Sequence, residues 1–265
     1  MPVVGLGTWK LTGSKCLHAV KKALELGYQH IDTAEIYMNE SEIGRSIKES
    51  KIPREKLFIT SKVWPDGLDY YKVLAACEES LARLEIHYLD LYLIHWPNKN
   101  LDYENVLNAF KVLYKKGKIK AFGVSNFTTN HLKNIIPICK KLNLPLTVNQ
   151  VEFHPLLYQE ELLEFCKKNK IVITAYSPLA RGKITENETI KEVSKKYDKT
   201  PIQISLKWLL QKGIVVIPKA SSEKHLRENL ELAFNLAKED VSKIDNIGKH
   251  VQRRLIIPNF AEFDY

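Results

Sequence analysis

Residues 28–37 read YQHIDTAEIY, a short apolar run that ends in an acid and is followed by a phenol. Two further runs have the same form, because LFITSK ends in Lys62 and LYLIH ends in His95. In a barrel of parallel strands the strand ends meet on one rim, and that rim carries the chemistry of such folds. The pattern therefore predicts that Asp32, Tyr37, Lys62 and His95 meet in one pocket, as a proton-transfer site.

Strand-like and helix-like segments alternate along the chain, which predicts a parallel sheet with crossover helices. The predicted strands are Val3–Thr8, His30–Thr33, Leu57–Lys62, Leu89–His95, Ala121–Ser125, Thr147–Glu152, Val172–Tyr176 and Val215–Pro218. Helical periodicity is clearest in residues 15–27, 70–85, 104–117, 159–169 and 201–213. Eight strand–helix units in 265 residues have the size of a TIM barrel, an α/β fold of the (β/α)8 type.

Two additional helices are expected around the last barrel units, at residues 221–233 and 238–250. No low-complexity linker divides the chain, so residues 1–265 are predicted to form a single domain. A doubly wound sheet is the rival fold and would favour a glycine-rich GxGxxG motif after the first strand. Here Gly5-Leu6-Gly7 continues as Thr8-Trp9-Lys10 and the third glycine is missing, which favours the barrel.

The composition is that of an ordinary globular protein, with 45% hydrophobic and 27% charged residues. No run approaches the roughly 18 apolar residues of a membrane span and no signal peptide is recognisable, so a cytoplasmic location is expected. The formal net charge is +9, but the lysines are scattered over the helices and predict a solvated surface rather than a nucleic-acid site. Such a field still attracts an anionic cofactor or substrate.

The cysteines are expected to be reduced and structural, because they are far apart and lie in segments with helical periodicity. They are Cys16, Cys77, Cys139 and Cys166. No Cys/His cluster has metal-ligand spacing, so no metal is predicted.

The proton-transfer hypothesis concentrates on Tyr37. A free phenol has a pKa of about 10 and is a poor proton donor at neutral pH. A neighbouring ammonium such as Lys62 would lower that pKa, and a buried carboxylate such as Asp32 would hold the lysine charged. His95 would orient the substrate oxygen by a hydrogen bond. Each residue alone has a plainer structural interpretation, and it is their shared placement at strand ends that supports catalysis.

At these residues the chain resembles the aldo-keto reductase family over nearly its whole length. The motifs that carry the resemblance are GLGTW, HIDTAEIYMNE, SKVW, LYLIHWP, GVSNF, NQVEFHP, AYSPLA and IPKAS followed by ENL. The family is a TIM barrel that binds a nicotinamide dinucleotide without a Rossmann domain, and its prokaryotic members include diketogluconate and aldehyde reductases. The resemblance implies that Asp32, Tyr37, Lys62 and His95 form the catalytic tetrad, with Tyr37 as general acid.

The same resemblance implies a set of cofactor contacts. Ser125, Asn126 and Gln150 match residues that hold the nicotinamide carboxamide, and Tyr176 matches the ring that stacks on the nicotinamide. Ser177 and Leu179 match contacts of the pyrophosphate loop.

The adenosine end departs from the family pattern. Lys219 matches the residue that meets the 2′-phosphate of NADP, and Glu228 and Asn229 match adenine contacts. Many NADP-preferring members have an arginine where this chain has His225. A guanidinium is always charged and binds phosphate bidentately, whereas an imidazole is not always charged at neutral pH. We therefore expect NADPH as cofactor with a weakened preference over NADH. The residues considered for compensation are Ser221, Ser222 and Arg227.

The pocket walls are predicted to include Trp9, Trp64 and Trp96, with Phe127 as a further candidate. Tryptophan at these places suits apolar or sugar-like carbonyl compounds, although packing of the barrel rim is the competing interpretation. Two departures from the family concern the chain's ends. The N-terminal hairpin that closes the barrel bottom is expected to be largely absent, and a short C-terminal stretch, residues 250–265, is expected to leave the pocket more open.

The sequence thus predicts an oxidoreductase that transfers hydride between a nicotinamide cofactor and a small aldehyde or ketone, acting as a monomer. The main alternative is a cofactor-binding regulatory module with little turnover, which would have no need of the four tetrad residues. A barrel lyase or isomerase is a third possibility, but it would leave Gln150, Tyr176 and Lys219 unexplained.

Overall fold

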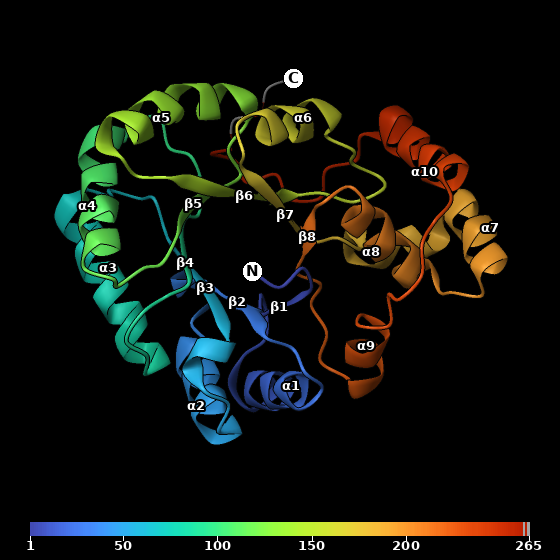
Figure 1. Ribbon diagram of the computed structural model, residues 1–265, viewed down its shortest axis with the longest axis horizontal. Coiled ribbons are helices and arrows are strands. Elements are labelled where there is room, and N and C mark those ends of the chain that lie inside the picture. Colours follow the sequence, from blue (N-terminus) through green and yellow to red (C-terminus); the bar gives the residue numbers. More distant parts are fainter. Residues whose placement is uncertain (262, 264–265) are drawn as a thin grey trace.

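The computed structural model describes residues 1–261 and 263, and its centre is one parallel sheet of eight strands in the order of the chain. Each strand pairs with the next in parallel register and the helices surround the sheet as an outer ring (Figure 1). The strands are β1 Gly5–Gly7, β2 His30–Asp32, β3 Phe58–Val63, β4 Leu91–Ile94, β5 Phe122–Ser125, β6 Leu146–Glu152, β7 Val172–Tyr176 and β8 Val215–Val216. The TIM-barrel prediction is confirmed.

The sheet closes where its first and last strands meet. Val4 and Val216 form a parallel bridge, and the backbone N–H of Gly7 donates to the carbonyl of Pro218 over 3.2 Å. A β-carbon at Gly7 would lie 2.6 Å from the carbonyl oxygen of Ile217, so only glycine permits this approach of the two strands. The seam brings the chain's first strand against its last.

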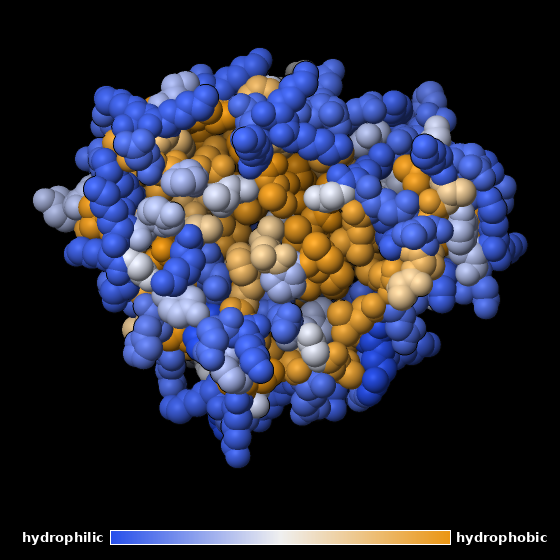
Figure 2. Space-filling view, viewed as in Figure 1, coloured by the Kyte–Doolittle hydropathy of each residue, from blue (hydrophilic) through white to orange (hydrophobic). Residues whose placement is uncertain are grey.

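Apolar side chains fill the barrel interior below the rim. Leu91, Leu93 and Val148 are buried there as one cluster, against which Phe58 and Ala121 pack. These residues lie on β3, β4 and β6 and, for Ala121, directly before β5, and strand side chains point alternately inward and outward. Figure 2 shows apolar side chains gathered over the strands and hydrophilic ones around them. The barrel is therefore a packed core, and its chemistry is confined to its rim.

The crossover helices lie where the periodicity placed them, with helix boundaries that follow local signals. For α8, the Thr200 side chain accepts from the N–H of Gln203 while the Gln203 side chain accepts from the N–H of Thr200, and Pro201 occupies the first turn. The helices are α1 Gly13–Glu25, α2 Glu40–Ser50, α3 Tyr70–Leu84, α4 Tyr103–Lys115, α5 Thr129–Leu142, α6 Glu160–Lys168, α7 Glu188–Tyr197, α8 Pro201–Gln211, α9 Glu223–Glu228 and α10 Lys238–Val251.

The prediction of extra helices around the last barrel units is also confirmed. Both α7 and α8 lie between β7 and β8, and both α9 and α10 follow β8. The cysteines lie in α1, α3, α5 and α6 with buried, unpaired thiols, as expected. No described helix combines the length and the apolar character needed to cross a membrane.

Several strands are shorter than predicted. The run Val3–Thr8 forms a strand only over Gly5–Gly7, and Val215–Pro218 only over its first two residues. Thr8, Ile217 and Pro218 are buried beyond the ends of these two strands although they form no further strand pairing, whereas Val3 is exposed. Hydrophobicity alone therefore overestimates how far the pairing extends.

Candidate active site

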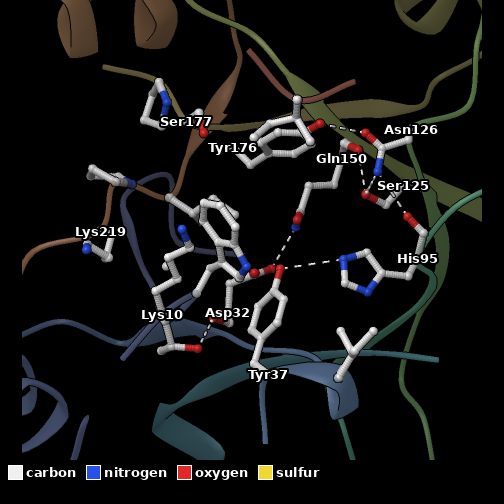
Figure 3. A pocket seen from close by; sticks show the side chains of 18 of the residues that line it. Lys10, Asp32, Tyr37, His95, Ser125, Asn126, Gln150, Tyr176, Ser177 and Lys219 are labelled. Atoms are coloured by element: carbon white, nitrogen blue, oxygen red, sulfur yellow. Dashed lines mark hydrogen bonds between the residues drawn. The ribbon is translucent and has the colours of Figure 1, made fainter. Parts of the chain in front are cut away.

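A pocket of about 860 Å³ opens at the carboxyl ends of the strands and gathers most of the predicted site residues (Figure 3). Those that line it are Trp9, Asp32, Tyr37, Trp64, His95, Trp96, Ser125, Asn126, Gln150, Tyr176, Ser177, Leu179 and Lys219. They come from strand ends and from the loops that follow, in keeping with the geometry of a parallel barrel.

The floor of the pocket rests on a buried ion pair. Lys62 Nζ donates to Asp32 Oδ1 over 2.6 Å and to the carbonyl of Thr33 over 2.7 Å, and the lysine side chain is fully buried. The second carboxylate oxygen of Asp32 accepts from Gln150 Nε2 at 2.6 Å. Burial lowers the pKa of Lys62, while the Asp32 charge opposes that effect. A buried charge pair of this kind is stable only because both partners are well hydrogen-bonded.

Tyr37 and His95 lie together at the pocket floor. Tyr37 follows β2 in a short 3₁₀ turn, Glu35–Tyr37, and its Oη lies 3.5 Å from His95 Nε2. Burial lowers the pKa of His95 well below its usual range, and the Lys62 charge adds to the shift. The imidazole is therefore neutral at physiological pH. Its Nδ1 is buried and has no hydrogen-bond partner among the described residues, which leaves Nε2 to act toward the pocket.

The pKa of Tyr37 moves in the opposite direction from the sequence-based expectation. Burial raises the pKa of the phenol well above 10, and the Asp32 charge raises it further. The Lys62 ammonium lies 5.2 Å from the centre of the Tyr37 ring, but it is already paired with Asp32. Desolvation of a buried phenol therefore outweighs the pull of a lysine whose charge is balanced.

A hydrogen-bonded chain of hydroxyl and amide groups lies beside the floor. Tyr176 Oη donates to Asn126 Oδ1 at 2.8 Å, and Ser125 Oγ donates to the Gln150 carbonyl at 2.8 Å. Asn126 Nδ2 also donates to the carbonyl of His95 at 3.0 Å. Asn126 has a left-handed backbone with φ of 64°, a conformation that asparagine tolerates better than most residues. These hydrogen bonds fix the Tyr176 ring at the edge of the pocket.

Two cations at the pocket were missed from the sequence. Lys10 Nζ lies 4.6 Å and Arg181 Cζ 5.0 Å from the centre of the Trp9 ring, and both residues line the pocket. Arg181 lies in the irregular segment Ala180–Glu186 after β7 and has a left-handed backbone, with φ of 53°. With Lys219 they give one side of the pocket three positive charges. The only sequence signal was their position directly after the quoted GLGTW and AYSPLA motifs.

The predicted adenosine-end residues other than Lys219 do not line this pocket. Their segment follows β8, and in it the Ser222 side chain accepts from the N–H of His225 at the start of α9. Arg227, considered for compensation, is paired with Glu223 at 2.6 Å and its charge is already balanced. The predicted residues that lie outside the pocket are Ser221, His225, Glu228 and Asn229, and Lys62 lies beneath its floor.

Another part of the pocket is aromatic. Trp64 and Trp96 each meet the ring of Phe260 edge-on, with centroids 5.7 and 5.6 Å apart. The Trp64 backbone N–H donates to Glu35 Oε1 at 2.6 Å, which fixes the loop after β3. Phe127 is not part of this wall, because its ring is buried and meets Tyr103 edge-on outside the pocket. Phe260 was not foreseen. It packs against two residues that line the pocket, and Ile256 and Pro258 of the same C-terminal stretch line the pocket themselves.

Fold and site together define a (β/α)8-barrel protein with a buried acid, amine and imidazole and a half-buried phenol at the carboxyl end of its strands. The chain belongs to the aldo/keto reductase family, whose model matches residues 3–249. It is therefore an oxidoreductase of a family that uses nicotinamide cofactors.

Named relatives and solved structures agree with this placement. A glyoxal reductase of Bacillus subtilis (strain 168) is 47% identical, over 94% of this chain and 90% of the relative. A 9,11-endoperoxide prostaglandin H2 reductase of Trypanosoma cruzi (strain CL Brener) is 43% identical, over 94% of this chain and 88% of the relative. The crystal structure of MGS-M4, an aldo-keto reductase from a deep-sea metagenome library of the Medee basin, superposes with a TM-score of 0.91. It is 43% identical, and the match covers 100% of this chain and 97% of that one.

Proposed function

We propose that this protein reduces an aldehyde or ketone to an alcohol, with Tyr37 as the proton donor. The observation that carries the proposal is the floor of the pocket, where Tyr37 Oη and His95 Nε2 lie 3.5 Å apart above the buried Lys62–Asp32 pair. A carbonyl oxygen placed between the phenol and the imidazole would meet two hydrogen-bonding groups at once. General acid assistance of this kind contributes roughly 10²- to 10⁴-fold to a rate.

The protonation states fit this role. Tyr37 carries its proton at neutral pH, but its raised pKa makes the buried phenol a weaker acid than a free one, so that donation depends on stabilisation of the phenolate. The lowered pKa of His95 keeps the imidazole neutral, so that it orients the carbonyl without competing as an acid. Once the phenol has given up its proton, the nearby Lys62 ammonium stabilises the phenolate. Lys62 thus still favours the phenolate, as expected from the sequence, but it does so once the proton has been transferred and not by lowering the pKa of the free phenol.

The residues around the pocket suit a nicotinamide dinucleotide. When bound, the reduced nicotinamide supplies the hydride. The hydroxyl and amide groups of Ser125, Asn126 and Gln150 are the donor and acceptor types that a carboxamide requires. The Tyr176 ring, fixed by Asn126, offers a face for stacking. Lys10, Arg181 and Lys219 supply positive charge for phosphate groups on the same side of the pocket.

We propose NADPH as the cofactor, with NADH also accepted. Lys219 is exposed at the pocket, where its ammonium is free to meet a 2′-phosphate as a point charge. His225 lacks the permanent charge of an arginine, and the Arg227 guanidinium is occupied by Glu223. The remaining positive charge favours the phosphorylated cofactor, but less strongly than a bidentate arginine would.

For the substrate we propose a small aldehyde. The name of the glyoxal reductase relative gives a two-carbon dialdehyde as the first compound to test. The aromatic side of the pocket adds a place for an apolar substituent on the carbonyl carbon.

The test is to follow consumption of NADPH and of NADH with glyoxal, an aromatic aldehyde and a keto-sugar. Turnover with either cofactor supports the proposal, and the ratio of the two efficiencies measures the cofactor preference. Tight cofactor binding without turnover on any carbonyl compound would instead favour a regulatory module.

A further inference from the structure

A second buried carboxylate lies at the end of a barrel strand, two residues beyond Gln150. Glu152 closes β6 and its side chain is fully buried. Its Oε1 lies 2.9 Å from His154 Nε2 and accepts the backbone N–H of Leu255 at 2.8 Å. Its Oε2 accepts the backbone N–H of Ile256 at 2.9 Å. The proposed reaction makes no use of this group, and Glu152 does not line the pocket.

The two backbone amides belong to the segment after α10, residues 252–261, which we call the C-terminal strap. Figure 1 shows the chain after α10 returning toward β6. The strap is first tied to the loop after β6, since Arg253 N–H donates to the Leu156 carbonyl at 2.7 Å and Arg254 Nη2 donates to Gln159 Oε1 at 3.0 Å. Glu152 then holds the next two residues.

Beyond this attachment the strap forms part of the pocket. Ile256 and Pro258 line the pocket, and the Phe260 ring packs edge-on against Trp64 and Trp96, which also line it. Phe260 is 52% exposed, so ring contacts alone hold it weakly. Its position depends on where the strap is fixed upstream.

We propose that Glu152 is a positioning residue that sets the aromatic wall of the substrate pocket. Hydrogen bonds from backbone N–H groups to a carboxylate are shorter and stronger than neutral ones. Because Glu152 is buried and its two partners are consecutive amides, the strap is fixed in both register and direction where it enters the pocket. The strap in turn presents Phe260 to the tryptophans. The consequence for substrate choice rests on the proposed carbonyl reduction, whereas the anchoring does not.

The variant that isolates this role is Glu152→Gln. The amide keeps the size of the side chain, but its NH₂ group cannot accept a hydrogen bond. In either orientation of the amide one of the two strap N–H groups loses its acceptor. Hydrogen exchange at the Leu255 and Ile256 amides should then accelerate by roughly ten-fold or more, the scale of one lost charge-assisted hydrogen bond. Unchanged exchange at both amides would overturn the proposal, whether or not the protein turns over any substrate.

Kinetics give the readout that a purely structural role would not move. Wild type and Glu152→Gln are compared on glyoxal, which has no apolar substituent to pack against Phe260, and on 4-nitrobenzaldehyde, whose ring would pack there. We expect KM for the aromatic aldehyde to rise roughly three- to ten-fold with kcat nearly unchanged, and KM for glyoxal to stay constant, in line with the loss of a modest apolar contact. An equal rise of KM for both substrates would contradict the assignment.

Two further variants complete the design. Asp240→Asn is the matched control, because Asp240 is also a fully buried carboxylate, paired with Lys196 and Tyr197 at the start of the helix that leads into the strap. It should reduce stability without raising KM for the aromatic aldehyde more than KM for glyoxal.

Phe260→Ala removes an exposed ring, folds irrespective of the outcome for Glu152, and should reproduce the KM change on its own. In the double variant with Glu152→Gln the two effects should not add, and full additivity would show that Glu152 does not act through the strap. Absence of turnover in the wild type would reject the proposed function, while the exchange measurement would still decide the anchoring.

Discussion

The two ends of the barrel each bury a histidine, and the histidines differ in what they face. His30 opens β2 at the amino end, where its Nε2 lies 3.2 Å from Thr60 Oγ1 and its ring meets Phe58 edge-on. His95 follows β4 at the carboxyl end, where its Nε2 lies 3.5 Å from Tyr37 Oη. Burial lowers the pKa of both imidazoles, to about 4 for His30. Burial and a shifted pKa therefore do not distinguish chemistry from packing, whereas an open pocket and a proton-bearing neighbour do.

The strongest test of this difference between the two ends is to remove the phenol at the carboxyl end of the barrel. Tyr37→Phe should reduce kcat by roughly 10²-fold to 10⁴-fold, because the proton donor is lost while the ring remains. Cofactor affinity, measured by fluorescence titration, should change little. The control is Tyr92→Phe, which removes a fully buried hydroxyl on β4 that has no described hydrogen-bond partner. Comparable losses in both variants would remove Tyr37 from its assigned role.

Asp32 allows a second test, because at the carboxyl end of the barrel this one residue is expected to support both stability and the proposed chemistry. Asp32→Asn would leave the fully buried Lys62 without its counter-charge. Removing one partner of a buried pair costs roughly 3–5 kcal/mol, and the amide recovers part of that through its own oxygen. We expect both the free energy of unfolding in urea and kcat to fall. A variant with wild-type stability would mean that Lys62 is neutral in the folded protein.

At the amino end the expected effect is on stability alone. The folded protein holds His30 neutral down to a pKa of about 4, whereas the unfolded chain takes up the proton near the ordinary value of 6.5. Stability is therefore lost as the pH falls from 6.5 toward 4, by up to roughly 3 kcal/mol in total. In His30→Gln the urea-unfolding free energy should depend less steeply on pH in this window, and kcat at pH 7 should match wild type. An unchanged pH dependence would show that folding does not lower the pKa of His30.

The smallest effect is expected outside both ends, at the exposed α9. His225→Arg adds a permanent charge and a guanidinium fork near the segment that carries Lys219. We expect the ratio of kcat/KM for NADPH over NADH to rise by roughly three- to ten-fold, the value of one exposed charge-assisted contact. Because Arg227 is neutralised by Glu223, Arg227→Lys serves as the control and should leave the ratio unchanged. A constant ratio in His225→Arg would place the 2′-phosphate elsewhere.

The floor of the site and the tryptophans of its wall could be predicted from the sequence, but the part of the wall that depends on the C-terminal strap could not. Asp32, Lys62 and His95 end short apolar runs, and a parallel barrel brings such ends together without knowledge of any long-range contact. The wall depends on contacts between distant parts of the chain, such as Glu152 with Leu255, which are 103 positions apart. No periodicity of the last segment predicts that it returns to β6. Likewise, the direction of the Tyr37 pKa shift depends on burial, which the pairing of residue types did not include.

The seam between β1 and β8 has a consequence for how the protein is made. Trp9 and Lys10 come from the first residues of the chain and Lys219 from the last barrel unit, and they face the same pocket only after Gly7 has closed on Pro218. During synthesis the ribosome has already delivered the residues of the floor long before β8 emerges. A nascent chain thus carries the reactive groups well before it can enclose a dinucleotide, and a ligand that contacts both sides of the seam would stabilise only completed molecules.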